Sequence, residues 1–180
     1  LKYVKREFSD ILIIGPLTEF AEMILGLEKS RPVCVRLTDS DLSSPDMVRA
    51  EEDRLPFGPE SFDLIITAGT LDSVNDLPGA LIQMRRILRK DGLLLANIFG
   101  AGTLSTLKQI MLAADGDRPA PHIHPQIDLR NAADLLVRTG FALPVVDQDM
   151  LTVRYGDLRR LLSDIRDMGV GNALAGNRPY

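Results

Sequence analysis

The sequence predicts an α/β fold of the doubly wound class, with a mostly parallel, seven-stranded sheet that ends in a C-terminal antiparallel hairpin. Short apolar runs of strand length alternate along the chain with longer amphipathic segments of helical period. Several of the short runs are apolar almost throughout, which is typical of parallel strands that helices cover on both faces. A tight polar turn between the last two apolar runs permits only an antiparallel pair.

The first 67 residues of the chain contain four strand-like runs. The β-branched run Ile11–Ile14 is stopped by glycine and proline, and the run 33–37 ends in a polar turn. An amphipathic pattern over 18–27 predicts a helix between them. A short run at 48–50 and the apolar run Phe62–Thr67 supply the next two strands. The pattern of this part of the chain therefore predicts strands joined by helical crossovers, as a parallel sheet requires.

The remaining elements follow from capping residues and periodicity. A helix is predicted over 76–90, because Asp76 is suited to cap its start and Gly92 to end it. An apolar strand over 93–99 comes next. Three further helices are predicted over 103–114, 131–139 and 157–168. The runs 141–147 and 150–155 form the predicted hairpin, which supplies the sixth and seventh strands.

Composition narrows the classes of function. The chain of 180 residues carries 21 basic and 25 acidic side chains, a net charge of −4, which argues against a general nucleic-acid binder. Cys34 is the single cysteine, so no internal disulfide forms and a reducing, cytoplasmic compartment is expected. No apolar run is long enough for a membrane span. The chain begins at Leu1, so we expect it to be a piece of a longer protein.

Two motifs resemble a known family. Leu-Pro-Phe at 55–57 followed by Ser-Phe-Asp-Leu at 61–64, and Leu-Arg-Lys-Asp-Gly-Leu at 88–93, resemble class I S-adenosylmethionine-dependent methyltransferases of the type 11 family. Further runs resemble the subgroup that contains the methyltransferase-like assembly factor of mitochondrial complex I and its bacterial relatives, with the malonyl-carrier methyltransferase of the biotin pathway further off; these runs lie at 74–81, 99–104, 121–125 and 167–173. The resemblance implies a Rossmann-like methyltransferase fold in a single domain, 1–180, that is truncated at one or both ends.

The resemblance also implies a binding site for S-adenosylmethionine. Gly15 stands at the first glycine of the family's cofactor loop, where a side chain would collide with the ligand. Asp39 would hold the ribose hydroxyls and Glu51 the adenine amino group, although a capping aspartate and a solvated acidic turn are the alternative interpretations. The residues that would line the cofactor near its methyl group are Thr67, Ala68 and Gly69. Asp72 and Ser73 stand where close relatives carry His-Trp, on the substrate side of the pocket.

The cofactor loop departs from the family pattern at three positions. Ile13 replaces an acidic residue, Leu17 replaces the second glycine, and Glu19 places a negative charge where the cofactor's carboxylate would bind. Three hypotheses therefore stand. The chain is a methyltransferase acting on a small molecule or a protein side chain, or it is a relative without cofactor that works through protein contacts as an assembly factor. The third, which the resemblance to the complex I factor implies, is an arginine hydroxylase-like protein.

Other motifs carry little function. Methyl transfer is mostly alignment of the acceptor with an activated methyl group, so no catalytic side chain is assigned. His122 and His124 lie in a proline-rich loop without cysteines or clustered carboxylates, so no metal site is expected.

Overall fold

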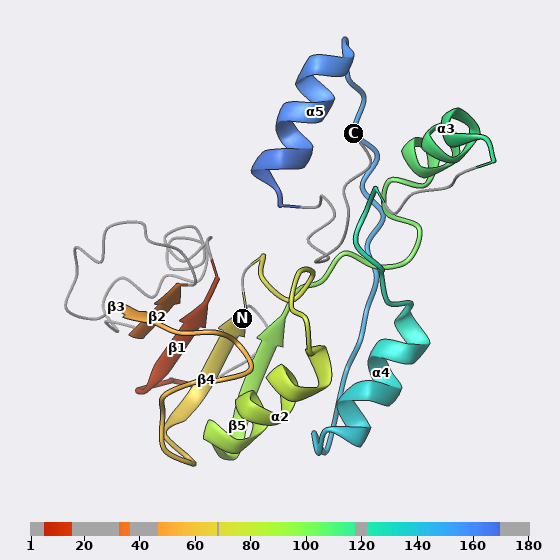
Figure 1. Ribbon diagram of the computed structural model, residues 1–180. Coiled ribbons are helices and arrows are strands. Elements are labelled where there is room, and N and C mark those ends of the chain that lie inside the picture. Colours follow the sequence, from red (N-terminus) through yellow and green to blue (C-terminus); the bar gives the residue numbers. More distant parts are fainter. Residues whose placement is uncertain (1–5, 16–32, 37–46, 68, 118–121, 170–180) are drawn as a thin grey trace.

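The computed structural model describes residues 6–15, 33–36, 47–67, 69–117 and 122–169 (Figure 1). Within them, parallel strands form one five-stranded sheet in the order β3-β2-β1-β4-β5. The strands are β1 (Ile11–Ile14), β2 (Val33–Arg36), β3 (Met47–Arg49), β4 (Phe62–Thr67) and β5 (Leu88–Ala96). The chain runs outward from β1 to β3 and then returns to the other side of β1 with β4. The strand order therefore reverses between β1 and β4, which is a topological switch point.

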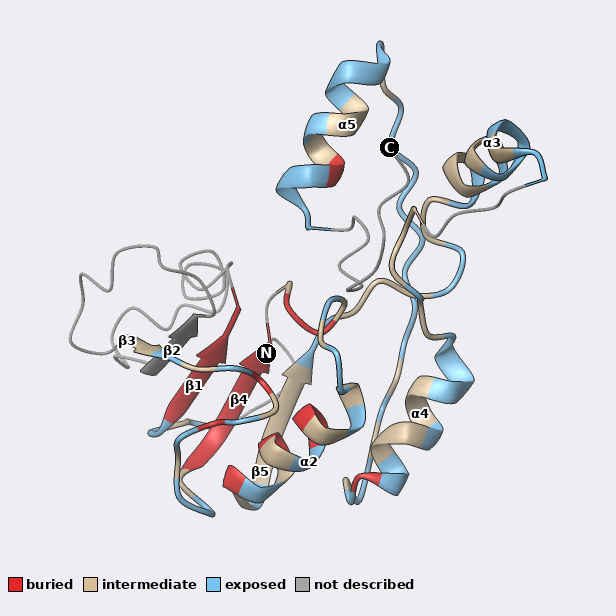
Figure 2. Cartoon of the chain, in the orientation of Figure 1, coloured by how far each residue is buried: buried red, intermediate tan, exposed pale blue. Residues whose placement is uncertain are grey.

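The central strands are buried on both faces, as their uniformly apolar sequences predict. Leu12, Ile14 and Ile65 face a core that includes helix α2 (Leu77–Ile87). Ile13 and Leu64 belong to a second buried cluster on the opposite face. Figure 2 shows that the buried residues are concentrated in β1, β4 and α2. The strands predicted at 11–14, 33–37, 48–50 and 62–67 are confirmed. The helix expected over 18–27 lies outside the described residues.

Helix α2 begins where the sequence predicts and ends about one turn earlier. The backbone N–H of Gly79 donates to Asp76 Oδ1 at 2.9 Å, which confirms the cap. The predicted end at 90 is wrong, because the backbone at Leu88 is extended and pairs with Phe62 of β4. Leu88 is 3% exposed, so its apolar side chain is buried as part of β5 rather than as the last turn of a helix.

The C-terminal helices are confirmed within a few residues of their predicted ends. They are α3 (Ser105–Asp115), α4 (Leu129–Arg138) and α5 (Leu158–Asp167). Aspartate side chains cap two of them: Asp128 accepts from the N–H of Asn131, and Asp157 accepts from the N–H of Arg160. In Figure 1, α4 lies on the α2 side of the sheet, whereas α3 and α5 lie beyond its carboxyl edge. None of the described helices has the length and apolar character needed to cross a bilayer.

The predicted antiparallel hairpin over 141–155 is wrong. This segment is described throughout and contains no strand, so the described sheet has five strands rather than seven. It runs as an extended connection between α4 and α5 (Figure 1), and Leu143 and Val145 are each 92% exposed. Alternating apolar residues favour a strand only where a neighbouring strand pairs with the backbone, and here none of the described strands does.

Candidate functional site

The carboxyl edge of the sheet at the switch point carries a glycine and an unpartnered hydroxyl. Gly15 directly follows β1 with a φ of 120°, a conformation that side-chain-bearing residues rarely adopt. Thr67 ends β4 in register with Ile14 of β1. Its side chain is 2% exposed, and its Oγ1 has no hydrogen-bond partner among the described residues. In doubly wound sheets this edge is where ligands bind, so a ligand atom is the natural partner for that hydroxyl.

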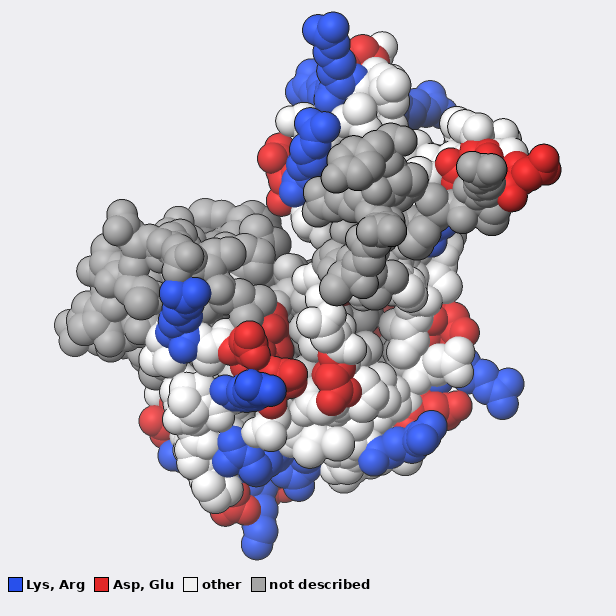
Figure 3. Space-filling view, viewed as in Figure 1, with Lys and Arg blue, Asp and Glu red and all other residues white. Residues whose placement is uncertain are grey.

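The turn that follows β3 contains the predicted site residue Glu51 and a second acidic residue, Glu52, that is buried. Glu51 is exposed, but its neighbour Glu52 is 5% exposed and accepts a hydrogen bond from the Thr70 hydroxyl. Burial raises the pKa of Glu52 from 4.5 to about 7. Figure 3 shows a group of acidic side chains over this turn. Sequence reasoning missed Glu52, because nothing in a run of three acidic residues distinguishes the one that points inward.

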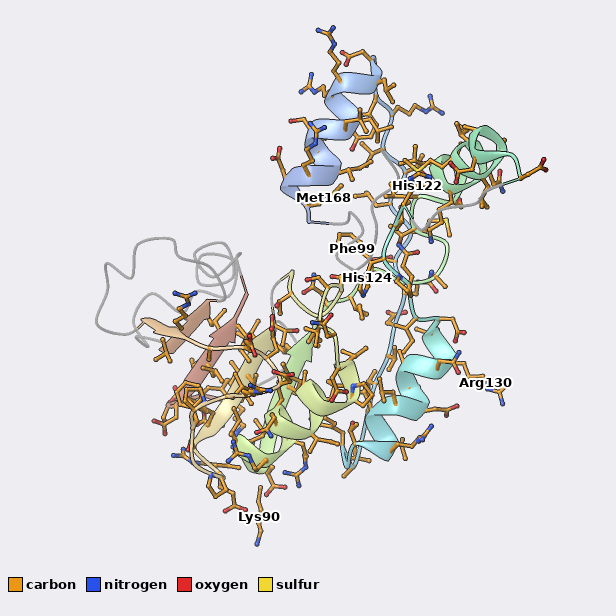
Figure 4. All side chains as sticks on the ribbon, in the orientation of Figure 1. Lys90, Phe99, His122, His124, Arg130 and Met168 are labelled. Atoms are coloured by element: carbon orange, nitrogen blue, oxygen red, sulfur yellow. The ribbon has the colours of Figure 1, made fainter. Side chains whose placement is uncertain are left out.

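A cavity of about 120 Å³ lies between the turn after β4, the segment after β5 and the loop that precedes α4. Figure 4 shows that Phe99 and His124 lie near one another on this side of the molecule, and both line the cavity. Most of the lining is apolar; the members are Leu71, Val74, Leu77, Ile98, Phe99, Pro125, Ile127 and Gly169, together with Asp72, His124 and Gln126. An apolar cavity with a few polar groups is the usual form of a small-molecule site.

Two of the polar groups in the cavity lack partners. His124 Nδ1 and Gln126 Nε2 are buried without a hydrogen bond among the described residues, while Gln126 Oε1 accepts from Lys108 Nζ at 2.6 Å. The Asp72 carboxylate accepts from the Phe99 N–H. Burial raises the pKa of Asp72, and this hydrogen bond and the nearby His124 act in the opposite direction.

The remaining predicted site residues do not all lie at the site. Gly69 joins the same edge, where its N–H donates to Asn97 Oδ1 at 3.3 Å. Ser73 is exposed and does not line the cavity, although its neighbour Asp72 does. Asp39 and Ala68 lie outside the described residues.

The two histidines have different surroundings. His122 Nε2 lies 3.0 Å from each carboxylate oxygen of Asp115, away from the cavity that His124 lines. No group of three metal-ligating side chains occurs in the described part of the chain. Sequence reasoning weighed His124 only as a metal ligand and did not consider Gln126.

Comparison with known proteins shows what the chain is similar to. Residues 12–96 match a family described as a methyltransferase domain. This match spans 85 of the 180 residues and shows that this part of the chain is similar to that domain. It is 34% identical over 133 residues to the malonyl-[acyl-carrier protein] O-methyltransferase of Laribacter hongkongensis, covering 74% of this chain and 44% of that protein. It is 38% identical over 128 residues to the human mitochondrial arginine-hydroxylase NDUFAF5, covering 69% of this chain and 37% of that protein.

The solved structures agree on the fold. The structure of an S-adenosylmethionine-dependent methyltransferase from Thermotoga maritima superposes with a TM-score of 0.57 at 20% identity, covering 77% of this chain and 66% of that chain. The predicted Rossmann-like methyltransferase fold is confirmed by this likeness, with the correction to the C-terminal hairpin given above. The chain spans less than half the length of the two curated relatives described above.

Proposed function

We propose that this protein is an S-adenosylmethionine-dependent methyltransferase that acts on a small molecule or a protein side chain. The observation that carries the proposal is the pairing of a glycine-bearing switch point with a small apolar cavity on the same edge of the sheet. The first offers room for a cofactor and the second for an acceptor. The match of residues 12–96 to a methyltransferase domain and the similarity to a malonyl-[acyl-carrier protein] O-methyltransferase support it.

The described residues of the predicted cofactor site fit such a group. Gly15 leaves space for close approach to the backbone, and the buried Thr67 hydroxyl lacks a partner that a polar ligand atom would provide. We propose that Gly69 and Ala68 line the methyl end, and that Asp39 and Glu51 bind the ribose and adenine. The cofactor would supply a methyl group already activated on a sulfonium sulfur. The protein's part is then to align the acceptor and to exclude water.

A second candidate activity rests on similarity to proteins named arginine-hydroxylase NDUFAF5. Under this candidate, the replaced loop residues Ile13, Leu17 and Glu19 mark a site that no longer transfers methyl groups, and the protein either hydroxylates an arginine side chain or works through protein contacts. Ile13 is fully buried within β1, so no carboxylate is available at that position of the strand. For either activity we propose a reducing, cytoplasmic compartment, because Cys34 is the single cysteine of the chain.

Calorimetric titration with S-adenosylmethionine and S-adenosylhomocysteine tests the first proposal. The variant Thr67→Val should weaken binding about fivefold, because it removes the hydroxyl that the ligand would satisfy. The same variant should raise the free energy of unfolding of the ligand-free protein, since an unpartnered buried hydroxyl is lost.

Thr139→Val is the matched control. Its hydroxyl is also buried but already donates to Leu135 O at 2.8 Å, at the end of α4. This control should lower stability by about 1 kcal/mol and leave the affinity for cofactor unchanged. Absence of heat from a folded sample at millimolar ligand would contradict the methyltransferase proposal. A product heavier by an oxygen atom rather than by a methylene group would favour the second candidate.

A further inference from the structure

Two residues that line the cavity each carry a buried polar atom without a hydrogen-bond partner among the described residues. His124 Nδ1 and Gln126 Nε2 are both buried, both residues line the cavity, and neither atom has a partner among the described residues. Buried polar atoms without partners are uncommon, because each costs about 1–3 kcal/mol. The amide of Gln126 is oriented by Lys108, whose ammonium donates to Oε1 and so leaves Nε2 as the free donor.

The two atoms together specify the chemistry of the missing group. An amide Nε2 is only a donor, so the ligand must present an acceptor to Gln126. In the neutral imidazole with its proton on Nε2, Nδ1 is an acceptor, and with this tautomer at His124 the ligand would present a donor. A hydroxyl group is both donor and acceptor, and one hydroxyl can therefore satisfy both atoms.

The third polar group of the cavity selects against anions. Asp72 also lines the cavity, and its Oδ1 is held by the Phe99 N–H. A ligand carboxylate placed in the same apolar cavity would be repelled by the carboxylate of Asp72. A cavity of about 120 Å³ with mostly apolar walls accepts a group about as large as a single ring, since an engineered cavity of about 150 Å³ binds benzene.

We propose that this cavity binds a neutral hydroxyl group on a small apolar body, with Gln126 donating to the hydroxyl oxygen, His124 accepting its proton, and Asp72 excluding carboxylates. If the bound hydroxyl compound is the methyl acceptor, which rests on the proposed function, the chain would methylate an alcohol or a phenol. It would then differ in acceptor from the relative named for a malonyl group.

The test is a set of NMR titrations of the protein without cofactor, with phenol, toluene and benzoate as probes. The three probes share one ring and differ in hydrogen bonding and charge. Phenol should bind with a Kd on the order of 1 mM, as expected for a fragment of this size. Toluene and benzoate should each bind about tenfold more weakly, the first for lack of hydrogen bonds and the second because of its charge.

Three variants assign the effect to named side chains. Gln126→Leu and His124→Ala should each weaken phenol binding about fivefold and leave toluene binding within about twofold. Asp72→Asn retains an oxygen for the Phe99 N–H but removes the charge, so it should bring benzoate to within about threefold of phenol. His122→Gln, whose histidine contacts Asp115 rather than the cavity, is the control and should bind phenol as the unaltered protein does.

Several results would overturn the proposal. Equal affinity for phenol and benzoate in the unaltered protein would contradict the exclusion of carboxylates. A benzoate affinity that Asp72→Asn leaves unchanged would contradict the role of Asp72 in it. Phenol binding that Gln126→Leu leaves unchanged in a folded protein would remove the hydroxyl site itself. Because these titrations contain no cofactor, they can succeed while S-adenosylmethionine fails to bind, which would contradict the methyltransferase proposal alone.

Discussion

The sheet with α2 and the region from 101 to 169 use similar apolar content in opposite ways. In the first region, Leu12, Ile65 and Met84 are fully buried against one another. In the second, Ile165 is the one hydrophobic residue among those described that reaches the buried class, at 9% exposed. The difference shows that the spacing of apolar residues decides whether a segment forms a helix or a strand. Their burial also requires another element that packs against them.

The cavity lies where these two regions meet. Asp72 comes from the turn after β4 and Phe99 from the segment after β5, whereas His124 and Gln126 come from the loop that precedes α4. The sheet region therefore supplies Asp72 and much of the apolar wall, and the less buried region supplies His124 and Gln126. Rigid strands with functional groups on the loops that follow them are a common arrangement of binding sites.

The largest effect should come from removing a core side chain of the sheet. Ile65→Ala deletes part of a residue that is 0% exposed, so it should lower the free energy of unfolding by about 2–5 kcal/mol. Val145→Ala, at a residue that is 92% exposed, is the matched change in the second region and should alter stability by less than about 0.5 kcal/mol. Urea unfolding of both variants checks the contrast, and equal effects would show that the two regions are packed alike.

A change of pH should affect the sheet region through Glu52. Its pKa is raised from 4.5 to about 7 in the folded protein, so the folded state retains a proton that the unfolded chain has lost. Its contribution to stability is therefore fully present below about pH 4.5 and is lost as the pH rises to about 7.

Glu52→Gln keeps an acceptor for the Thr70 hydroxyl and cannot ionise. The variant should therefore be more stable than the unaltered protein at pH 8, by on the order of 1–3 kcal/mol, and nearly equal to it at pH 4.5. Urea unfolding at the two pH values checks this. Glu51→Gln, at the exposed neighbour, is the control and should show no such difference.

A smaller effect is expected at the helix caps of the second region. Asp128→Ala removes the carboxylate that accepts from the N–H of Asn131, so it should lower stability by about 1 kcal/mol. Asp134→Ala lies exposed on the same helix and is the control, with an expected change below about 0.5 kcal/mol. Thermal unfolding measured on both variants would count against a capping role for Asp128 if the two melted alike.

The sequence predicts the sheet region well, because its strands are uniformly apolar and its helix α2 has a capping aspartate. It predicts the end of α2 less well: Leu88 fits a helix by periodicity, but its pairing with Phe62 decides the backbone. It fails over 141–155, since alternation cannot reveal whether a partner strand is present. Tertiary contacts decide both cases, and a local pattern does not contain them.

At the candidate site, too, the sequence predicts the residues that a local pattern marks and misses those that depend on tertiary contacts. Gly15 and Thr67 were predictable, because strand ends and a family motif mark them, and the register of β1 with β4 brings them to one edge. Glu52 and Gln126 were not, since their roles depend on which way a side chain turns within a polar segment. Only the folded chain shows that Glu52 turns inward and that Gln126 faces the cavity with His124.

Hydrogen–deuterium exchange with and without S-adenosylhomocysteine tests the central claim, that the carboxyl edge at the switch point is a cofactor site. We predict slower exchange on ligand addition in peptides that contain Gly15 and the residues after Thr67. Peptides from α4 and α5 should exchange at unchanged rates. Protection confined to α4 and α5, or no protection at saturating ligand, would contradict the claim.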